Sequence, residues 1–432
     1  MYETVGLADA RNAGTKLCPG DPAFLNSRTQ TYYRDRIERA WAGVHPMKGR
    51  TPQPGDIQLR TNDYLCLAGH PHVIEAEIQA LRSNGHGDAV SRVWLHEEKD
   101  TTSAFESRVA TLMRAEDALL CNSGYCANVG LIQSIANDTT PVYLDMKAHI
   151  SLWEGVLSAK ARAVPFRHNV ADHLERQIRK HGPGVICVDA LYSTDGNVAP
   201  LADMVDIAER MDCVLVVDET HSFGAHGRDG AGLCVAQDLA HRVHFRTIGL
   251  SKAVASRGGV IVCSRRNAEY LRYEALPAIF STSVLEHEIA GYNAVLNIFA
   301  GEDWRQEDLH ANHRWLVNAL DNLGYNVDAS KHQIIALEAG PIRETIRLRD
   351  ALEARNVFGA IFYPPATAEK RCLIRFTVNC GLTADEIRHV IQVCRDIREE
   401  VGLASWPSTR RRKRRTTARP AVDHEIVTQV SA

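Results

Sequence analysis

The feature that most constrains the fold is a regular alternation of short apolar runs and longer amphipathic stretches between about residues 58 and 265. The runs are rich in Val, Ile and Leu, which is typical of strands buried on both faces, as in parallel sheets. The stretches between them have helical spacing, as in LADMVDIAERM (201–211). This alternation predicts an α/β sandwich. The runs are DALLCNS (117–123), PVYLD (141–145), GVICVDA (184–190), DCVLVVDE (212–219), HFRTIGL (244–250) and GGVIVCS (258–264).

The pattern changes after about residue 300, where longer helical stretches alternate with strand-like segments. This order predicts a smaller C-terminal α+β domain. The expected helices cover 304–324, 344–356 and roughly 384–400, and the expected strands cover 334–339 and 372–378. We therefore divide the chain into an N-terminal arm and helix (1–57, with the helix at 32–44), a large domain (58–300), a small domain (301–404) and a tail (405–432).

Charge and composition exclude several classes of protein. Lys plus Arg is 50 and Asp plus Glu is 53, so no global basic field points to nucleic acid or an anionic membrane. The tail contains TRRRKRRTTARP (409–420), and we predict that this charge block is solvated and disordered. Contact of that block with nucleic acid or anionic lipid is the alternative.

The cysteines and the N-terminus predict a cytoplasmic protein. The 11 cysteines form no CxxC pair, so neither a zinc site nor a disulfide scaffold is indicated, and no metal is expected. A reducing compartment suits this usage. We see no signal peptide, and no run approaches the roughly 20 apolar residues that a membrane helix needs.

The segment VVDETHSFGAHG (216–227) places two polar side chains directly after an apolar run. In open α/β sheets, ligands bind at the carboxyl ends of strands. There Asp218 can pair with the protonated nitrogen of a pyridine cofactor and make its ring an electron sink. His221, three residues later, can reach the phenolic oxygen of the same ring. A capping aspartate and a loop histidine are the plainer interpretation.

Lys252 lies in RTIGLSKAVASRGG (246–259), after the next apolar run and among small residues. A desolvated lysine there has the lowered pKa that an amine nucleophile needs. An ordinary surface lysine is the alternative.

Two further segments offer contacts to a cofactor of this kind. Gly124 and Tyr125 follow a predicted strand and open a predicted helix, whose free backbone N–H groups can bind a phosphate. His149, in DMKAHISLWEG (145–155), can stack on the pyridine ring. A plain strand-to-helix turn and a buried structural histidine are the alternatives.

In order and spacing, these motifs resemble those of the α-oxoamine synthases, pyridoxal-phosphate (PLP) enzymes of fold type I that condense an amino acid with an acyl-CoA and release CO2. The similarity covers about 55–400. Within the family the chain most resembles the α-hydroxyketone autoinducer synthases of the Cqs/Lqs type. Matching segments include TNDYLCLAGHP (61–71), NSGYCANVG (122–130), AHISLWEG (148–155), DALYSTDGNVAPL (189–201), HSFGAHGRDGAGL (221–233), SKAVASRGG (251–259) and PAIFSTSVL (277–285).

The resemblance implies a fold-type-I transferase with a mostly parallel central sheet, PLP as cofactor, and a homodimer with shared active sites. Lys252 would hold PLP as a Schiff base, Asp218 would pair with the pyridinium nitrogen, and His221 would contact the phenolic oxygen. The resemblance gives similar roles to further residues: His149 stacks on the ring, Ser193 lies near the phenolic oxygen, Gly124 and Tyr125 bind the phosphate, Ser281 and Thr282 reach the phosphate of the neighbouring subunit, and Arg375 and Asn62 bind the amino-acid substrate.

The sequence departs from the family pattern in two places. The glycine-rich stretch that usually precedes the SGY motif is replaced by SNGHGDAVSRVWLHEEKD (83–100), so we expect a different substrate pocket. The family often has a hydroxyl residue three positions before the lysine, where this chain has Gly249. We expect Thr247 or Ser251 to replace that hydroxyl at the phosphate.

The resemblance implies an acyltransferase that makes an α-aminoketone from a medium- or long-chain acyl-CoA and either 2-aminobutyrate or S-adenosylmethionine. That product would be the precursor of an α-hydroxyketone quorum-sensing signal. The first alternative is a biosynthetic α-oxoamine synthase of the 8-amino-7-oxononanoate synthase or glycine C-acetyltransferase type. The second is a non-catalytic PLP-fold regulator that binds DNA through the basic tail.

Overall fold

The computed structural model describes residues 19–41, 43–88, 90–94 and 101–418, the last six of them by their backbone alone. The chain divides into two compact units, Met1–Gly49 and Arg50–Ala432. The described part of the first unit contains two helices, α1 (Ala23–Thr31) and the π-helix η2 (Tyr32–Ala40). The helix predicted at 32–44 corresponds to η2. None of the described residues in either helix is buried. Parts of the predicted arm (1–18), of the departing stretch (95–100) and of the tail (419–432) lie outside the described residues.

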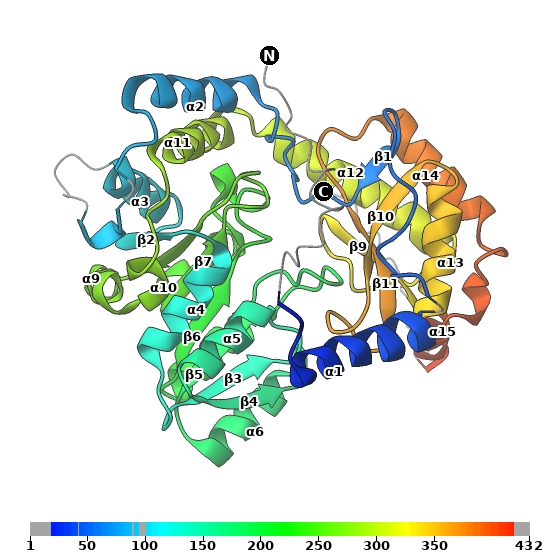
Figure 1. The fold of residues 1–432 in the computed structure, drawn as a ribbon, viewed down its shortest axis with the longest axis horizontal. Coiled ribbons are helices and arrows are strands. Elements are labelled where there is room, and N and C mark those ends of the chain that lie inside the picture. Colours follow the sequence, from blue (N-terminus) through cyan, green and yellow to red (C-terminus); the bar gives the residue numbers. More distant parts are fainter. Residues whose placement is uncertain (1–18, 42, 89, 95–100, 419–432) are drawn as a thin grey trace, which may run out of the picture. The chain divides into compact units, whose positions relative to one another are not determined.

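Within the described part of the second unit, seven strands form one sheet in the order β2-β8-β7-β6-β5-β3-β4 (Figure 1). β8 runs antiparallel to β2 and β7, and the remaining neighbours pair in parallel. The six predicted strands are confirmed, as is the mostly parallel sheet. The strands are β2 (Asp117–Cys121), β3 (Pro141–Asp145), β4 (Arg162–Phe166), β5 (Val185–Asp189), β6 (Val214–Asp218), β7 (Phe245–Gly249) and β8 (Gly259–Cys263).

The antiparallel strand β8 places the carboxyl end of β2 at the same edge of the sheet as the carboxyl ends of the parallel strands. Because β8 is antiparallel to both of its neighbours, β2 runs in the same direction as β7. The carboxyl ends of β2, β3, β5, β6 and β7 therefore lie at one edge of the sheet. Ligand sites of open α/β sheets form at that edge.

Helices cover both faces of this sheet, which explains the continuous apolar runs. All five residues of β5 are buried. Val185 and Cys187 pack into one apolar cluster, while Ile186 and Val188 pack into another. The first cluster includes residues of α4 (Gly124–Ile135) and α5 (Ile150–Ser158). The second includes residues of α6 (Ala171–His181) and α7 (Leu201–Arg210).

A second sheet of four described strands has the order β1-β10-β11-β9, with β1 (Ile57–Leu59) parallel to β10 (Val357–Phe362). β11 (Cys372–Thr377) is antiparallel to both β10 and β9 (Ile334–Gly340). The predicted strands at 334–339 and 372–378 are confirmed, and so are the three predicted helices. These helices are α12 (Trp304–Asn322), α13 (Ile342–Glu353) and α14 (Ala384–Asp396).

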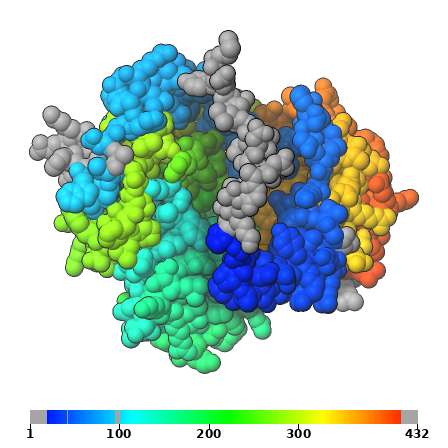
Figure 2. All heavy atoms as spheres, in the orientation of Figure 1, coloured from blue at the N-terminus to red at the C-terminus, as the bar shows by residue number. Residues whose placement is uncertain are grey.

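In the space-filling view, the cyan and green atoms of residues 101–300 gather apart from the yellow-to-red atoms of the later residues (Figure 2). None of the helices in the described ranges is both long and apolar enough to cross a bilayer. The remaining helices are α2 (Pro71–Asn84), α3 (Thr101–Leu112), α8 (Leu233–Ala236), α9 (Arg265–Glu274), α10 (Leu276–Ile279) and α11 (Glu286–Gly301), with 3-10 turns at 92–94, 228–230, 240–242 and 403–405.

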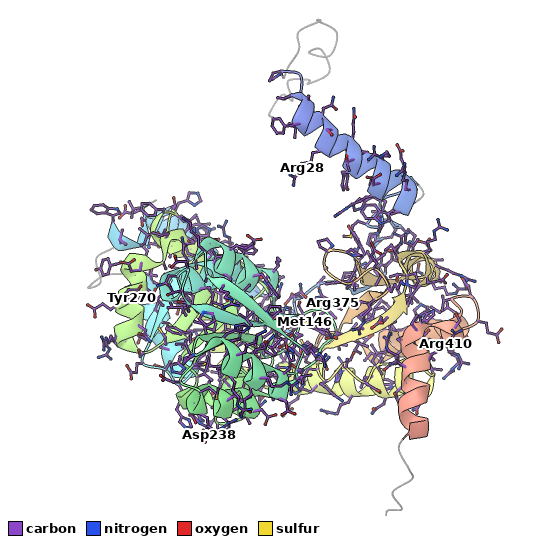
Figure 3. The ribbon with its side chains drawn as sticks, turned by 90° about the horizontal axis from the view of Figure 1, so that it is seen from below. Arg28, Met146, Asp238, Tyr270, Arg375 and Arg410 are labelled. Carbon is purple, nitrogen blue, oxygen red and sulfur yellow. The ribbon has the colours of Figure 1, made fainter. Side chains whose placement is uncertain are left out.

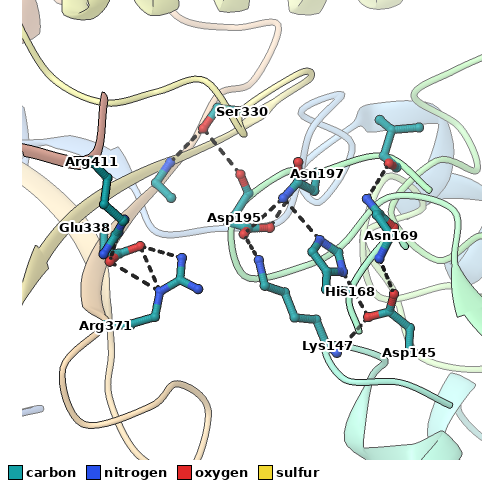
Figure 4. Close-up of polar contacts among 12 residues, drawn as sticks. Asp145, Lys147, His168, Asn169, Asp195, Asn197, Ser330, Glu338, Arg371 and Arg411 are labelled. Atoms are coloured by element: carbon teal, nitrogen blue, oxygen red, sulfur yellow. Dashed lines mark hydrogen bonds and ion pairs between the residues drawn. The ribbon is translucent and has the colours of Figure 1, made fainter. Parts of the chain in front are cut away.

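The C-terminal tail requires a correction, because residues 405–418 are not disordered. They end a 3-10 turn and form α15 (Pro407–Ala418). Trp406 is 2% exposed, and its indole N–H donates to the carbonyl of Val401 (2.9 Å). The Arg411 guanidinium pairs with Glu338, which also pairs with Arg371 (Figure 4). Part of the positive charge is thus paired with an acidic residue of the small sheet, although the Arg411 side chain is still about half exposed.

Candidate active site

A cavity of about 230 Å³ lies at the carboxyl edge of the large sheet. It brings together seven of the predicted residues: Gly124, Tyr125, His149, Asp218, His221, Ser251 and Lys252. These residues come from segments that follow β2, β3, β6 and β7. The other lining residues are Ser123, Asn128, Asp189, Thr220, Gly249, Arg257 and Gly258.

Lys252 is the amine of this cavity. It follows β7, in a turn where its carbonyl accepts the backbone N–H of Ala255 (2.8 Å). Burial lowers the pKa of Lys252, and the positive charge of Arg375 lowers it further, while Asp218 acts in the opposite direction. A lysine with a lowered pKa is more often unprotonated, which is the state that an amine nucleophile or a base requires.

Asp218 is held in a fixed orientation at the end of β6. It is 5% exposed, and its two carboxylate oxygens accept from the side-chain amide of Asn128 (2.7 Å) and from the backbone N–H of Thr220 (2.9 Å). The amide oxygen of Asn128 accepts the hydroxyl of Thr247 (2.6 Å). A buried carboxylate that is oriented in this way is suited to face a cationic ring nitrogen.

Asp189 adds a second acidic group, directly opposite Asp218 in the register of β5 and β6. It is 3% exposed, and it accepts the backbone N–H of His149 (3.1 Å). Burial first, and the nearby Asp218 carboxylate second, raise the pKa of Asp189 well above its usual value. The raised pKa favours the protonated form of Asp189, so the two carboxyl groups differ in their environment.

His221 is buried, and a single hydroxyl group orients its imidazole. Burial lowers the pKa of its imidazole well below the usual value, with smaller contributions from Lys252 and Arg375. Its Nδ1 lies 2.5 Å from the hydroxyl of Tyr64, and burial raises the pKa of that phenol. A neutral phenol can donate to Nδ1 or accept from an Nδ1–H, so this contact orients the imidazole ring in either tautomer.

His149 is oriented by the same network. Its Nδ1 is 2.7 Å from the hydroxyl of Ser151, and that hydroxyl also accepts from the amide of Asn128 (2.8 Å). The Ser151 hydroxyl thus donates its hydrogen to His149. Asn128 thereby connects the residue predicted to stack on the ring with the residue predicted to pair with its nitrogen, Asp218.

The N-terminus of α4 forms part of the cavity wall and suits an anion. Ser123 caps α4 by accepting from Cys126 N–H (3.0 Å), and the first amides of the helix have no partner within it. A Cβ on Gly124 would lie 2.9 Å from the Cα of Gly249, so only glycine allows this approach. The amine, the carboxylate and the anion-binding helix end together fit PLP.

Arg375 (labelled in Figure 3) lies on β11 of the small sheet and contacts the loop after β5 through Ser193. It is 6% exposed and donates to the carbonyl of Ser193 (2.8 Å) and to the amide oxygen of Asn62 (3.0 Å). Its Nε–H is buried without a partner, and none of the described ion pairs gives it an acidic partner. A buried guanidinium with an unused N–H is suited to bind a carboxylate ligand.

Some of the predicted residues lie outside the cavity. Ser193 and Asn62 contact Arg375 instead. The hydroxyl of Thr247 donates its hydrogen to the amide oxygen of Asn128. Thr247 is thus a positioning residue and not one of the groups lining the phosphate end. Ser281 and Thr282 do not line the cavity of their own chain, and their contact with a neighbouring subunit stays a prediction.

Several lining or supporting residues were missed from the sequence. Tyr64 and Asn128 stand inside motifs that carried the resemblance, and their polar side chains within apolar context were the available signal. Asp189 ends a predicted strand, as Asp218 does, so the same reasoning applied to it. No sequence signal singled out Thr220 or Arg257, because a threonine beside a histidine and an arginine among small residues are common in loops.

Comparison with known proteins agrees with this geometry. Residues 54–393 match the aminotransferase class I and II family. A CAI-1 autoinducer synthase of Vibrio campbellii is 40% identical over 375 residues, covering 87% of this chain and 95% of that protein. A putative 8-amino-7-oxononanoate synthase of Halalkalibacterium halodurans is 32% identical, covering 78% of this chain and 85% of that protein.

Solved structures show the same fold. A serine palmitoyltransferase from S. paucimobilis with bound PLP is 25% identical, with a TM-score of 0.77, and the match covers 88% of this chain and 98% of that one. The match to the family, the fold and the cavity agree with one another. The chain belongs to the aminotransferase class I and II family, and within it to the PLP-dependent α-oxoamine synthases.

Proposed function

We propose that this enzyme condenses an amino acid with a medium- or long-chain acyl-CoA to give an α-aminoketone, free CoA and CO2. The amino acid is 2-aminobutyrate or S-adenosylmethionine, and the product is the precursor of an α-hydroxyketone quorum-sensing signal. The observation that carries the proposal is the buried guanidinium of Arg375, whose Nε–H has no hydrogen-bond partner. Arg375 is not one of the residues that line the cavity, but its positive charge lowers the pKa of Lys252. The guanidinium offers a partner for the carboxylate of an amino acid held at Lys252.

The roles of the residues follow from their positions. Arg375 binds the carboxylate and orients the amino acid, and Ser193 and Asn62 hold the guanidinium in place. The unprotonated Nζ of Lys252 accepts the proton of the α-carbon. Bound PLP supplies an electron sink for the negative charge that develops on that carbon. Asp218 would face the positive charge of the ring nitrogen, and the imidazole of His221 would lie at the phenolate oxygen.

The autoinducer reaction is favoured over other α-oxoamine chemistry by the CAI-1 autoinducer synthase of Vibrio campbellii, to which the chain is 40% identical. Relatives named 8-amino-7-oxononanoate synthase are 29–32% identical. They support the second candidate, a biosynthetic synthase. The motif AHISLWEG (148–155), which forms the start of α5, is the sequence feature that favours the first.

We also propose that the enzyme works in the cytoplasm as a homodimer with shared active sites. The ten cysteines among the described residues are free thiols, which suits a reducing compartment. Ser281 and Thr282, predicted to serve a neighbouring site, are displaced from the cavity of their own chain.

The test is the release of free thiol from decanoyl-CoA by the purified, PLP-loaded enzyme. The amino donors are supplied separately: 2-aminobutyrate, S-adenosylmethionine, glycine, alanine and serine. We expect CoA release with 2-aminobutyrate or S-adenosylmethionine and none with glycine or alanine. Release only with glycine, alanine or serine would favour a biosynthetic synthase, and no release with any donor would refute the acyl-CoA chemistry.

A further inference from the structure

The phosphate end of the cavity contains a close contact between three residues from three different segments. Gly124 opens α4, Gly249 ends β7, and Thr220 follows β6, and all three line the cavity. A Cβ on Gly124 would lie 2.9 Å from the Cα of Gly249. A Cβ on Gly249 would in turn lie 3.0 Å from Cγ2 and 3.3 Å from Oγ1 of Thr220. The side chain of Thr220 therefore occupies the space that a side chain at position 249 would need.

A hydrogen bond to the backbone of Gly249 also orients the hydroxyl of Thr220. Its oxygen accepts the backbone N–H of Gly249 (2.8 Å). A hydroxyl has one hydrogen to donate in addition to its lone pairs. None of the contacts among the described residues uses that hydrogen, so it remains for a ligand in the cavity.

The two hydroxyls that the sequence suggested for this role differ in position. Thr247 is 1% exposed and donates to Asn128, so its hydrogen is already used. Ser251 lines the cavity, and in the described contacts nothing fixes its hydroxyl. Thr220 lines the cavity and also has its oxygen fixed by a backbone N–H.

We propose that Thr220 donates a hydrogen bond to the phosphate of PLP, in place of a side chain at position 249. The donor sits beside the N-terminus of α4, where helix amides already favour an anion. The absence of a side chain at Gly249 is what allows Thr220 to reach this position. The inference concerns the cofactor and does not depend on which amino acid or acyl-CoA the enzyme uses.

The experiment compares PLP with pyridoxal, which has the same ring and aldehyde but no phosphate. The dissociation constant of each is measured by absorbance titration of the cofactor-free protein. Thr220→Val keeps the shape of the side chain and removes the hydroxyl, and Thr220→Ser keeps the hydroxyl. We expect Thr220→Val to weaken PLP binding about tenfold to hundredfold, the range for a hydrogen bond to a charged group, and to leave pyridoxal binding nearly unchanged. Thr220→Ser should stay close to the parent protein.

A double variant tests whether a hydroxyl at residue 249 can replace the hydroxyl at residue 220. Thr220→Ala combined with Gly249→Thr moves the hydroxyl to residue 249 and removes the atoms that would crowd it. We expect this pair to bind PLP more tightly than Thr220→Ala alone. Gly249→Thr alone should weaken PLP, because its Cβ crowds Thr220.

Two results would overturn the proposal. One is an equal loss of PLP and pyridoxal affinity in Thr220→Val, which would mean a general distortion of the cavity. The other is a phosphate-specific loss in Ser251→Ala with none in Thr220→Val, which would assign the hydroxyl to Ser251.

Discussion

At the scale of single residues, Arg375 combines a buried charge with an unused N–H. Its guanidinium donates to Ser193 and Asn62 and lies over the ring of Phe362 (4.6 Å), so none of these described contacts supplies a negative charge. Arg375→Lys keeps the charge and loses the planar fork that binds a carboxylate through two N–H groups. We expect KM for the amino acid to rise about tenfold to hundredfold while KM for the acyl-CoA changes little.

The matched control for that variant is Arg371→Lys. Arg371 pairs with Glu338 on the same sheet, but its side chain is half exposed. Steady-state kinetics with each substrate varied in turn should show no change for the control. An equal rise of both KM values in Arg375→Lys would contradict a role in binding the carboxylate.

We expect the buried amine of Lys252 to lower the free energy of unfolding of the cofactor-free protein at neutral pH, compared with an apolar side chain at the same position. Its pKa is lowered by burial, so the unfolded chain binds this proton more tightly than the folded chain does. This destabilisation has its full size below the lowered pKa of the folded protein, and it disappears as the pH rises towards the ordinary lysine pKa of about 10.4. We expect Lys252→Met to raise the melting temperature of the cofactor-free protein at pH 7, by a difference that shrinks as the pH rises.

The control for this measurement is Lys370→Met at an exposed position. It should change the melting temperature little at any pH. A difference between Lys252→Met and the parent that stays constant from pH 7 to about pH 10 would show that better packing of Met, and not the loss of a buried charge, stabilises the variant.

At the scale of elements, α15 shows how a few residues can hold a segment whose composition points to disorder. The anchor is Trp406, which is 2% exposed and contacts the ring of Tyr325 edge-on, with centroids 5.8 Å apart. We expect Trp406→Ala to lower the free energy of unfolding by about 3–5 kcal/mol in urea denaturation. Trp315→Ala, at a tryptophan that is 40% exposed, should cost much less. Equal effects of the two would mean that Trp406 is not an anchor.

The elements that could be predicted are those whose environment is uniform along their length. The six runs of the large sheet are buried on both faces, so their composition alone identifies them. β4 was not predicted because it is the last strand in the sheet order, alternates exposed and buried residues, and contains Pro165. β1 has three residues and depends on pairing with β10, some 300 positions later, which no local pattern shows.

The same limit applies to the site. Asp218, His221 and Lys252 each follow an apolar run, so their places at one sheet edge could be predicted. Asn128 and Thr220 could not, because their importance lies in contacts to residues 90 and 29 positions away in the chain. Sequence motifs predict the residues that contact a ligand more readily than they predict the residues that hold those side chains in position.

At the scale of the whole molecule, the proposed shared active site predicts complementation between defective subunits. Lys252→Ala removes the amine of one site, and Thr282→Ala removes a hydroxyl expected to serve the neighbouring site. A hybrid dimer carries both defects in one site and none in the other. We expect each variant to be inactive or weakly active alone, and an equal mixture, refolded together, to recover about a quarter of the parent activity. Recovery of none would argue that each chain completes its own site.

The reversed strand β8 also affects the order in which the enzyme can assemble during synthesis. Among the strands that the structure describes, β2 pairs with β8 alone, and 138 positions separate Cys121 from its partner Gly259. At translation rates of about 5–20 residues per second, the strand that leads into α4 waits roughly 7–28 s for that partner. Until then the ribosome-bound chain holds an unpaired apolar strand, a state that is prone to aggregation and that chaperones protect. The close approach of Gly124 to Gly249, which joins residues from both ends of this interval, is therefore among the last parts of the large sheet to form.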